Sequence, residues 1–165
     1  MKKLALLAVF GLLTLGSYAQ KIGHINSQEL LSLMPERTTA ETSLQDYAKG
    51  LESQLTSMQT EYQSMVENYQ NNEGSYDDLT KQDKIAEIQS LQERLTTFQQ
   101  SAQSSLQQKE QELLQPILKK AQNAIDAVAE NGKYTYILDS SSAGLILYSK
   151  DSEDILDKVK KELGL

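Results

Sequence analysis

Apolar side chains recur in alternating steps of four and three residues through the first half of the chain. The members of this series are Leu44, Ala48, Leu51, Leu55, Met58, Tyr62, Met65 and Tyr69. Such a heptad pattern is typical of a helix that packs along a narrow seam. Pro35 suits the first turn of this helix, and residues 71–75 (NNEGS) have the composition of a turn. The pattern predicts a helix over residues 36–70, roughly 50 Å long.

A second, looser apolar pattern follows the turn. It comprises Ile85, Ile88, Leu91, Leu95, Phe98, Ala102 and Leu106, and then Leu113, Ile117, Ala121, Ile125 and Val128, with Lys109 in a position where an apolar residue is expected. Two long helices joined by a short turn predict an antiparallel hairpin in which each helix covers the other's seam. We expect Pro116 to kink the second helix or to mark where it leaves the hairpin. Gly132 is expected to end that helix in the left-handed conformation.

Both ends of the chain change from helical to strand-like patterning. The predicted strands are Ile22–Ile25, Tyr134–Leu138 and Leu145–Tyr148, and Asp139–Gly144 would join the last two as a hairpin. Asn26 and Glu29 have the spacing of a capping box before a short helix. Asp151 is expected to cap a final helix whose Ile155, Val159 and Leu163 share one face.

These patterns together predict an α+β fold that is mostly helical. Residues 20–34 and 116–165 would form a small β-containing body, and residues 35–115 a long two-helix coiled-coil arm with its tip near 71–80. A body of about 60 residues rarely supplies more than a few kcal/mol of stability, so self-association is expected. The residues placed at that interface are Ile22, Ile25, Val128, Ile137, Leu145 and Leu147.

The first 19 residues have the three regions of a cleavable signal peptide. Lys2 and Lys3 are basic, Leu4–Gly16 is apolar apart from Thr14, and Ser17-Tyr18-Ala19 supplies small residues for cleavage after Ala19. The apolar run is too short to span a bilayer as a helix, which takes about 20 residues. The sequence predicts an exported protein with no stable membrane insertion.

Charge and composition argue against several classes of function. Loss of Lys2 and Lys3 with the signal peptide takes the formal net charge from −7 to −9, which disfavours nucleic acid as a partner. The chain has no Cys and one His, so neither disulfides nor a zinc site of the usual kind is expected. Asp139-Ser140-Ser141-Ser142 lacks the other members of a nucleophile triad. We expect no cofactor and no enzymatic activity.

The two ends of the mature chain carry a resemblance to a known family. The segments "KIGHINSQELLSLMPE" and "AIDAVAENGKYTYILDSSSAGLILYSKDSEDILDKVKKEL" resemble the Skp (OmpH-like) family of periplasmic chaperones. The resemblance implies a jellyfish-like homotrimer whose bodies join while three arms surround a cavity. It further implies that unfolded outer-membrane β-barrel proteins are held in this cavity, in the periplasm and without ATP. Residues 41–110, however, carry 12 acidic and 5 basic residues, so the family's contact with lipopolysaccharide is not carried over.

Candidate contacts with an unfolded client follow from this resemblance. They are Tyr47, Met58, Met65, Val66, Tyr76 and Leu79. Met58 and Met65 have an alternative role in packing the two helices together, since both lie on the heptad seam. The alternative function is a structural coiled-coil or adaptor protein of the cell envelope, which would have no affinity for unfolded chains.

Overall fold

A computed structural model describes residues 20–142 and 151–165 of the chain. The predicted signal peptide and the predicted strand Leu145–Tyr148 lie outside these residues. The chain divides into two compact units. We call residues 31–122 the helical unit, and residues 20–30 together with 123–142 and 151–165 the sheet unit.

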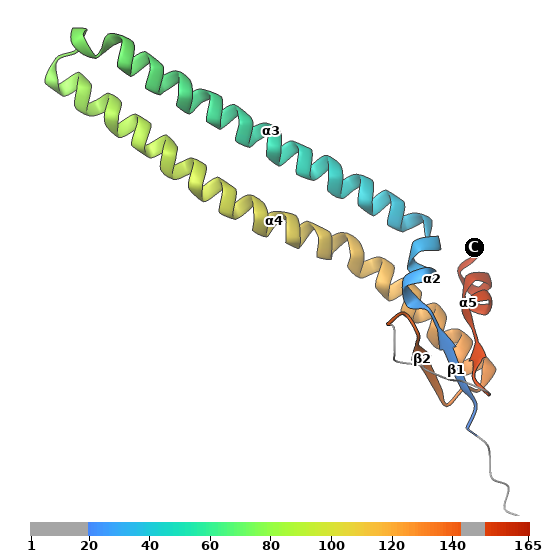
Figure 1. The fold of residues 1–165 in the computed structure, drawn as a ribbon. Coiled ribbons are helices and arrows are strands. Elements are labelled where there is room, and N and C mark those ends of the chain that lie inside the picture. Colours follow the sequence, from blue (N-terminus) through green and yellow to red (C-terminus); the bar gives the residue numbers. More distant parts are fainter. Residues whose placement is uncertain (1–19, 143–150) are drawn as a thin grey trace, which may run out of the picture. The chain divides into compact units, whose positions relative to one another are not determined.

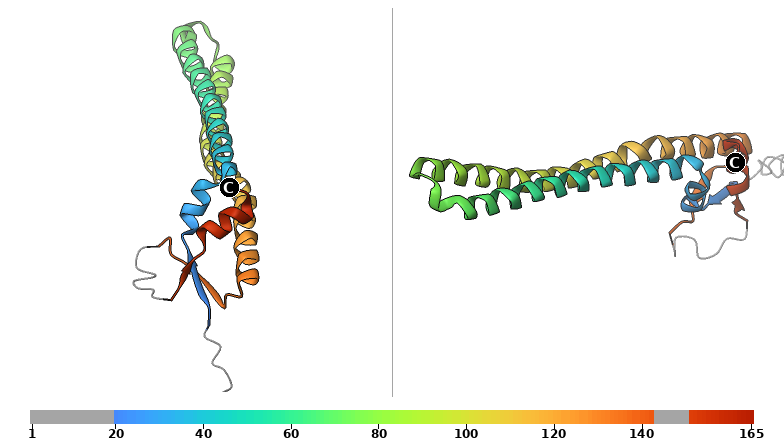
Figure 2. Two further views of the ribbon diagram at one scale, coloured as in Figure 1. Left: turned by 90° about the vertical axis from the view of Figure 1, so that its right-hand side faces the viewer. Right: turned by 90° about the horizontal axis from the view of Figure 1, so that it is seen from above.

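The helical unit is built on an antiparallel pair of long helices, as the sequence predicts (Figures 1 and 2). Helix α3 spans Pro35–Asn72 and begins with Pro35 in its first turn, after the extended residue Met34. A single 3₁₀ turn, η2 (Glu73–Ser75), follows α3 at the predicted turn. Helix α4 spans Asp78–Gly132 and continues through Pro116, and its last residues belong to the sheet unit.

Burial along α3 follows the heptad pattern. All eight seam residues from Leu44 to Tyr69 are half-buried, and most residues between them are exposed. On the facing stretch of α4, Leu91 is fully buried, while Leu95 and Phe98 are half-buried. The two helices therefore pack along a narrow seam and leave most of their surface in solvent.

The end of α4 differs in one detail from the prediction that Gly132 adopts the left-handed conformation. The left-handed residue is Lys133, with φ 55°. The Tyr134 amide donates to the carbonyl of Ala129 (3.0 Å) and the Lys133 amide to that of Glu130 (3.1 Å), which is a Schellman motif closing the helix. Glycine is needed at 132 for another reason, because a Cβ there would collide with the ring of Tyr134.

Three short parallel strands form the sheet, in the order β2-β1-β3. They are β1 (Ile22–Ile25), β2 (Tyr136–Asp139) and β3 (Glu153–Asp154). In the described residues β2 pairs with β1 in parallel. The segment predicted as its hairpin partner lies outside the described residues, so the hairpin stays a prediction. Strand β3 was not predicted, because two acidic residues carry no strand pattern.

Two short helices remain: α5 (Leu156–Leu163) belongs to the sheet unit, and α2 (Ser27–Leu33) begins in the sheet unit and ends in the helical unit. Helix α2 starts as predicted, since the Asn26 side chain accepts a hydrogen bond from the Glu29 amide at 3.1 Å. Helix α5 starts later than predicted, and Asp151 is not its cap. Because β3 holds residues 153 and 154 in the sheet, the helix begins only afterwards, and Asp154 accepts from the Leu156 amide at 2.9 Å.

The core of the sheet unit lies between the sheet and its helices. Ile25, Leu30, Ile155 and Val159 are at most 2% exposed. Gly23, in the middle of β1, lets three neighbours approach closely. A Cβ at this position would lie 2.8 Å from Ile137 Cδ1 and 3.2 Å from Ile155 Cγ2.

Candidate functional site

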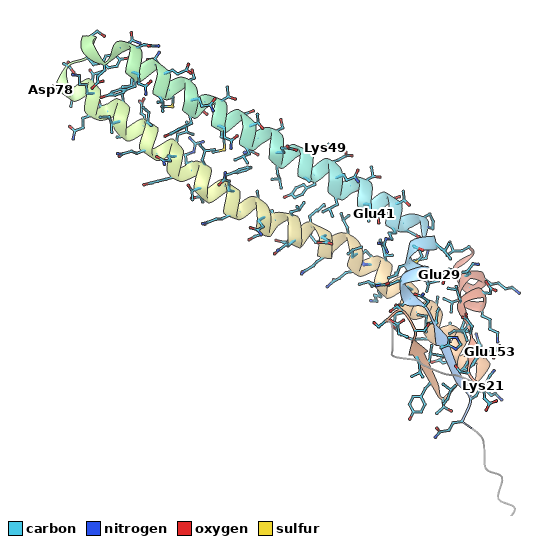
Figure 3. The ribbon with its side chains drawn as sticks, viewed as in Figure 1. Lys21, Glu29, Glu41, Lys49, Asp78 and Glu153 are labelled. Carbon is cyan, nitrogen blue, oxygen red and sulfur yellow. The ribbon has the colours of Figure 1, made fainter. Side chains whose placement is uncertain are left out.

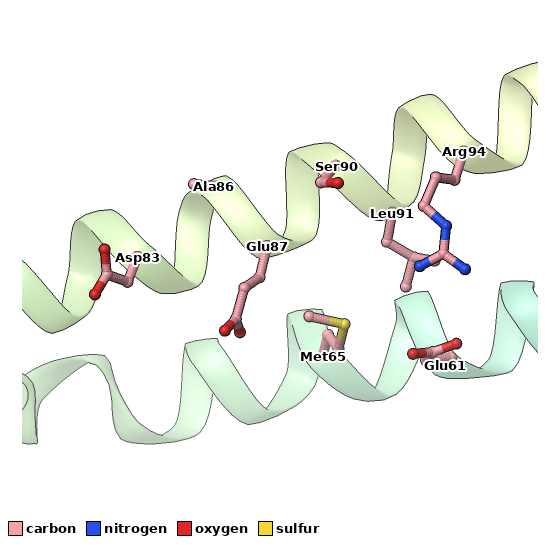
Figure 4. A pocket seen from close by; sticks show the side chains of 8 residues that line it. All are labelled: Glu61, Met65, Asp83, Ala86, Glu87, Ser90, Leu91 and Arg94. Carbon is pink, nitrogen blue, oxygen red and sulfur yellow. The ribbon is translucent and has the colours of Figure 1, made fainter.

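Two grooves lie between α3 and α4 within the helical unit. The first, of about 510 Å³, we call the acidic groove (Figure 4). It is lined by Glu61 and Met65 of α3 and by Asp83, Ala86, Glu87, Ser90, Leu91 and Arg94 of α4. The second, of about 470 Å³, is lined by Met58, Phe98 and several polar residues, and it shares Ser90 and Arg94 with the first. The side chains of α3 and α4 therefore do not fill the whole space along the seam, and a binding partner could reach apolar side chains in the two grooves.

The acidic groove combines apolar and charged side chains. Figure 4 shows Met65 extending toward α4, and Leu91 and Arg94 extending toward α3. Glu87 accepts a hydrogen bond from Lys84 at 2.7 Å, and this carboxylate raises the pKa of Lys84. The groove places the adaptable side chain of Met65 beside charged side chains, an arrangement suited to binding.

The structure separates the six candidate client contacts into three groups. Met58 and Met65 are half-buried on the seam, and each lines one of the two grooves. Tyr47 and Leu79 are exposed, to 36% and 69%, and line neither groove. Val66 and Tyr76 are half-buried. Sequence reasoning did not single out Glu61, Asp83 or Arg94, because the groove that they line needs residues from both α3 and α4.

The turn between α3 and α4 is organised by side-chain contacts. The rings of Tyr69 and Tyr76 are 6.3 Å apart, and the Tyr76 hydroxyl donates to Asn68 Oδ1 at 3.2 Å. The Asp77 carboxylate accepts from the Thr80 amide at 2.7 Å, and this hydrogen bond lowers the pKa of Asp77. Tyr76 therefore has a packing role at the turn, whereas Leu79 is left in solvent.

The oligomerisation candidates differ in how much surface they leave for a partner. Ile25 and Val128 are only 2% and 8% exposed, so the sheet unit's own core already covers them. Ile22 and Ile137 are half-buried, and Leu145 and Leu147 lie outside the described residues. The parallel register instead places Ile22 beside Tyr136 and His24 beside Leu138.

Ile22, His24, Tyr136 and Leu138 lie on one face of the sheet, which we call the outer face and which also carries Asp154 of β3 beside His24. Tyr136 is 58% exposed and Leu138 is 43% exposed, although both are large and apolar. His24 is held in place by its Nδ1 atom, which lies 2.8 Å from Ser152 Oγ. Sequence reasoning assigned Ile137 to the interface, but side chains alternate along a strand and Ile137 lies on the opposite face, near Gly23.

A charged cluster around Glu153 ties the two ends of the sheet unit together (Figure 3). Lys158 donates to Glu153 Oε1 and the Tyr134 hydroxyl to Oε2, both at 2.5 Å. Lys21 Nζ lies 3.5 Å from the same carboxylate and 4.0 Å from the centre of the Tyr134 ring. The hydrogen bonds from Lys158 and Tyr134 lower the pKa of Glu153 to about 2. The cluster is structural, because its members satisfy one another.

Asp139, the acidic member of the Asp-Ser-Ser-Ser run, also has a structural role. It accepts from the Ser27 hydroxyl at 2.7 Å and from the Ser141 amide at 2.9 Å. Within residues 20–142 and 151–165, no group of His, Asp and Glu is arranged to hold a metal ion. In the same residues, no helix combines the length and apolarity needed to cross a bilayer.

Comparison with known proteins gives a consistent result along almost the whole chain. The model of the family described as Outer membrane protein (OmpH-like) matches residues 21–163. The chain is 27% identical over 175 residues to the Chaperone protein Skp of Vibrio cholerae, with 99% of each chain covered. It is 27% identical over 165 residues to the Chaperone protein Skp of Yersinia enterocolitica, covering 97% of this chain and all of the relative.

A solved structure supports the fold independently. An OmpH-like protein from Caulobacter crescentus matches with a TM-score of 0.75, covering 90% of this chain and 86% of the other at 16% identity. The chain therefore belongs to the Skp (OmpH-like) family of chaperones, a family of binding proteins rather than enzymes.

Proposed function

We propose that this chain is a periplasmic holdase, which binds unfolded outer-membrane β-barrel proteins without ATP and prevents their aggregation. Membership of the OmpH-like family carries this proposal. The two grooves between α3 and α4 support it, since Met58, Met65 and Phe98 offer apolar surface that the hairpin does not close. Methionine adapts to partners of different shape, as a protein with many clients requires.

The proposal includes an organisation of the chain. Residues 1–19 act as a signal peptide that is cut after Ala19, residues 20–34 and 116–165 form the body, and residues 35–115 form the arm. Three chains associate through their bodies, and clients are held between the arms. The outer face of the sheet supports association, because the large side chains of Tyr136 and Leu138 are 58% and 43% exposed there.

Client contact is proposed for Tyr47, Met58, Met65, Val66, Tyr76 and Leu79. Of these, Leu79 is 69% exposed and Tyr47 36% exposed, so both can meet a client without any change in the hairpin. Met58 and Met65 would be reached through the grooves. Affinity spread over several weak contacts suits a holdase better than one deep pocket does.

Native mass spectrometry of residues 20–165 tests the function directly. The chain is measured alone and after dilution of a urea-unfolded outer-membrane β-barrel protein into it. We expect a trimer that gains one client chain, and less light scattering from the client than in buffer. A discrete oligomer that leaves the client to aggregate would contradict the holdase function and favour a structural or adaptor protein.

A further inference from the structure

We propose that the acidic groove selects the chemistry of the client, binding extended segments in which Lys or Arg residues flank apolar side chains. This inference rests on the proposed holdase function and adds to it the kind of segment that is recognised. It follows from three properties of the helical unit: the apolar floor of the groove, the unpaired carboxylates on its rim, and the net charge of the surrounding helices.

The floor of the groove is formed by apolar side chains, although the groove as a whole exposes more polar than apolar surface. Leu91 is 3% exposed, and Met65 is half-buried beside it. The volume of about 510 Å³ falls within the range of sites that hold small ligands. An extended client segment could therefore place an apolar side chain against the half-buried Met65 without separating α3 from α4, while Leu91 stays covered by the helices.

The rim of the groove carries negative charge that the protein itself neutralises only in part. Glu61 extends from α3, and Asp83 and Glu87 from α4 (Figure 4). Glu87 is paired with Lys84, but among the ion pairs of the fully described helical unit none includes Glu61 or Asp83. Arg94 is the only cation that lines the groove. Glu61 and Asp83 thus form no ion pair and can meet a cationic partner, although the charge of Asp83 also acts on Lys84, whose pKa it helps to raise.

The rest of the hairpin reinforces this preference. Residues 41–110 carry 12 acidic and 5 basic side chains, a net charge of −7. A field of one sign attracts segments of the opposite charge and repels acidic ones over about 10 Å at 0.1 M salt. Basic client segments would therefore associate faster with the helical unit, and those that also carry apolar side chains would dissociate more slowly from the groove.

Three matched unstructured peptides test the inference on residues 20–165. They share the same Phe and Leu positions and differ only in carrying Lys, Gln or Glu between them. We expect the Lys peptide to bind at least about tenfold more tightly than the Glu peptide at low salt, with the Gln peptide between them. Raising the salt concentration should narrow the difference, because the carboxylates of the groove face solvent.

A pair of double variants tests the place of binding. Glu61→Gln with Asp83→Asn removes the unpaired rim charges. Glu52→Gln with Glu67→Gln removes the same charge from exposed positions of α3 that line neither groove. We expect the first variant to weaken Lys-peptide binding about threefold while leaving Gln-peptide binding unchanged. The second variant, Glu52→Gln with Glu67→Gln, should weaken binding of the Lys peptide by clearly less than threefold and should leave binding of the Gln peptide unchanged.

The outcomes separate this inference from the function on which it rests. Equal binding of the three peptides, or tighter binding of the Glu peptide, overturns the charge preference even if an unfolded outer-membrane protein is still kept soluble. Equal weakening by the two double variants overturns the assignment to the acidic groove. If neither the peptides nor the outer-membrane protein binds, the holdase function itself is wrong.

Discussion

At the scale of single residues, Glu153 shows how one side chain connects the two ends of the sheet unit. Its carboxylate accepts from Lys158 and Tyr134, which lower its pKa from 4.5 to about 2. A carboxylate with a lowered pKa in the folded state stabilises that state above its unfolded pKa. The contribution is lost as the pH falls from 4.5 toward 2, where the folded carboxylate also becomes protonated.

We therefore expect Glu153→Gln to lower the thermal melting temperature at neutral pH. The difference in melting temperature between the variant and the parent chain should shrink as the pH falls from 4.5 and vanish at about pH 2. Circular dichroism melts across the pH range measure it, with Glu162→Gln, which removes an exposed carboxylate of α5, as the control. A difference that stays constant with pH would show that ionisation of Glu153 does not stabilise the fold.

Gly23 tests how closely the core of the sheet unit is packed. A Cβ at this position would lie 2.8 Å from Ile137 and 3.2 Å from both Ile155 and Tyr134. Ile137 lies in β2 and Tyr134 just before it, whereas Ile155 follows β3, so no single shift relieves all three contacts. We expect Gly23→Ala to destabilise the fold by about 1–3 kcal/mol. Urea unfolding measures the change. Gly74→Ala, with no atom within 4 Å of the added group, should leave the midpoint unchanged.

At the scale of elements, the long helices were predictable and the sheet was only partly so. The heptad series from Leu44 to Tyr69 repeats more than three times, so local sequence alone identified α3 and its buried seam. Strand β3 is held by pairing of Glu153 and Asp154 with β1, more than a hundred residues away in the chain. No local pattern signals that contact. The grooves were missed for the same reason, because each needs residues from both α3 and α4.

A substitution at Gly50 tests the stability of helix α3 without changing its packing. It lies within the helix, and an added Cβ would meet no atom within 4 Å. We expect Gly50→Ala to stabilise the chain by about 1 kcal/mol, because alanine loses less backbone entropy in a helix. The same substitution at Gly164, where φ is +74°, should instead destabilise it. Melting curves of the two variants that shift in the same direction would contradict this account.

At the scale of the whole molecule, the small core of the sheet unit limits how stable a single chain can be. Its core consists of a few residues such as Ile25, Leu30, Ile155 and Val159, and a core of this size stabilises a chain only weakly. The outer face nevertheless leaves Tyr136 and Leu138 in solvent. Association of bodies through this face would bury that surface, and it would bring the arms of several chains to one client.

We expect a double variant, Tyr136→Glu with Leu138→Glu, to convert the proposed trimer into monomers. Both side chains are already 58% and 43% exposed, so the charges should disturb association more than the fold of one chain. Sedimentation velocity measures the oligomer, and circular dichroism checks that the monomer stays folded. Leu79→Glu, a similar change at a 69% exposed position of the helical unit, should leave the oligomer intact.

The same variant separates assembly from client contact. If clients are held between arms, monomers should lose most of their ability to suppress client aggregation, although the acidic groove of each chain is unchanged. Binding of single short peptides should persist, because the groove is built from α3 and α4 of one chain. A double variant that remains trimeric would place the interface elsewhere on the body. A monomer that holds clients as well as the parent chain would show that each hairpin acts independently.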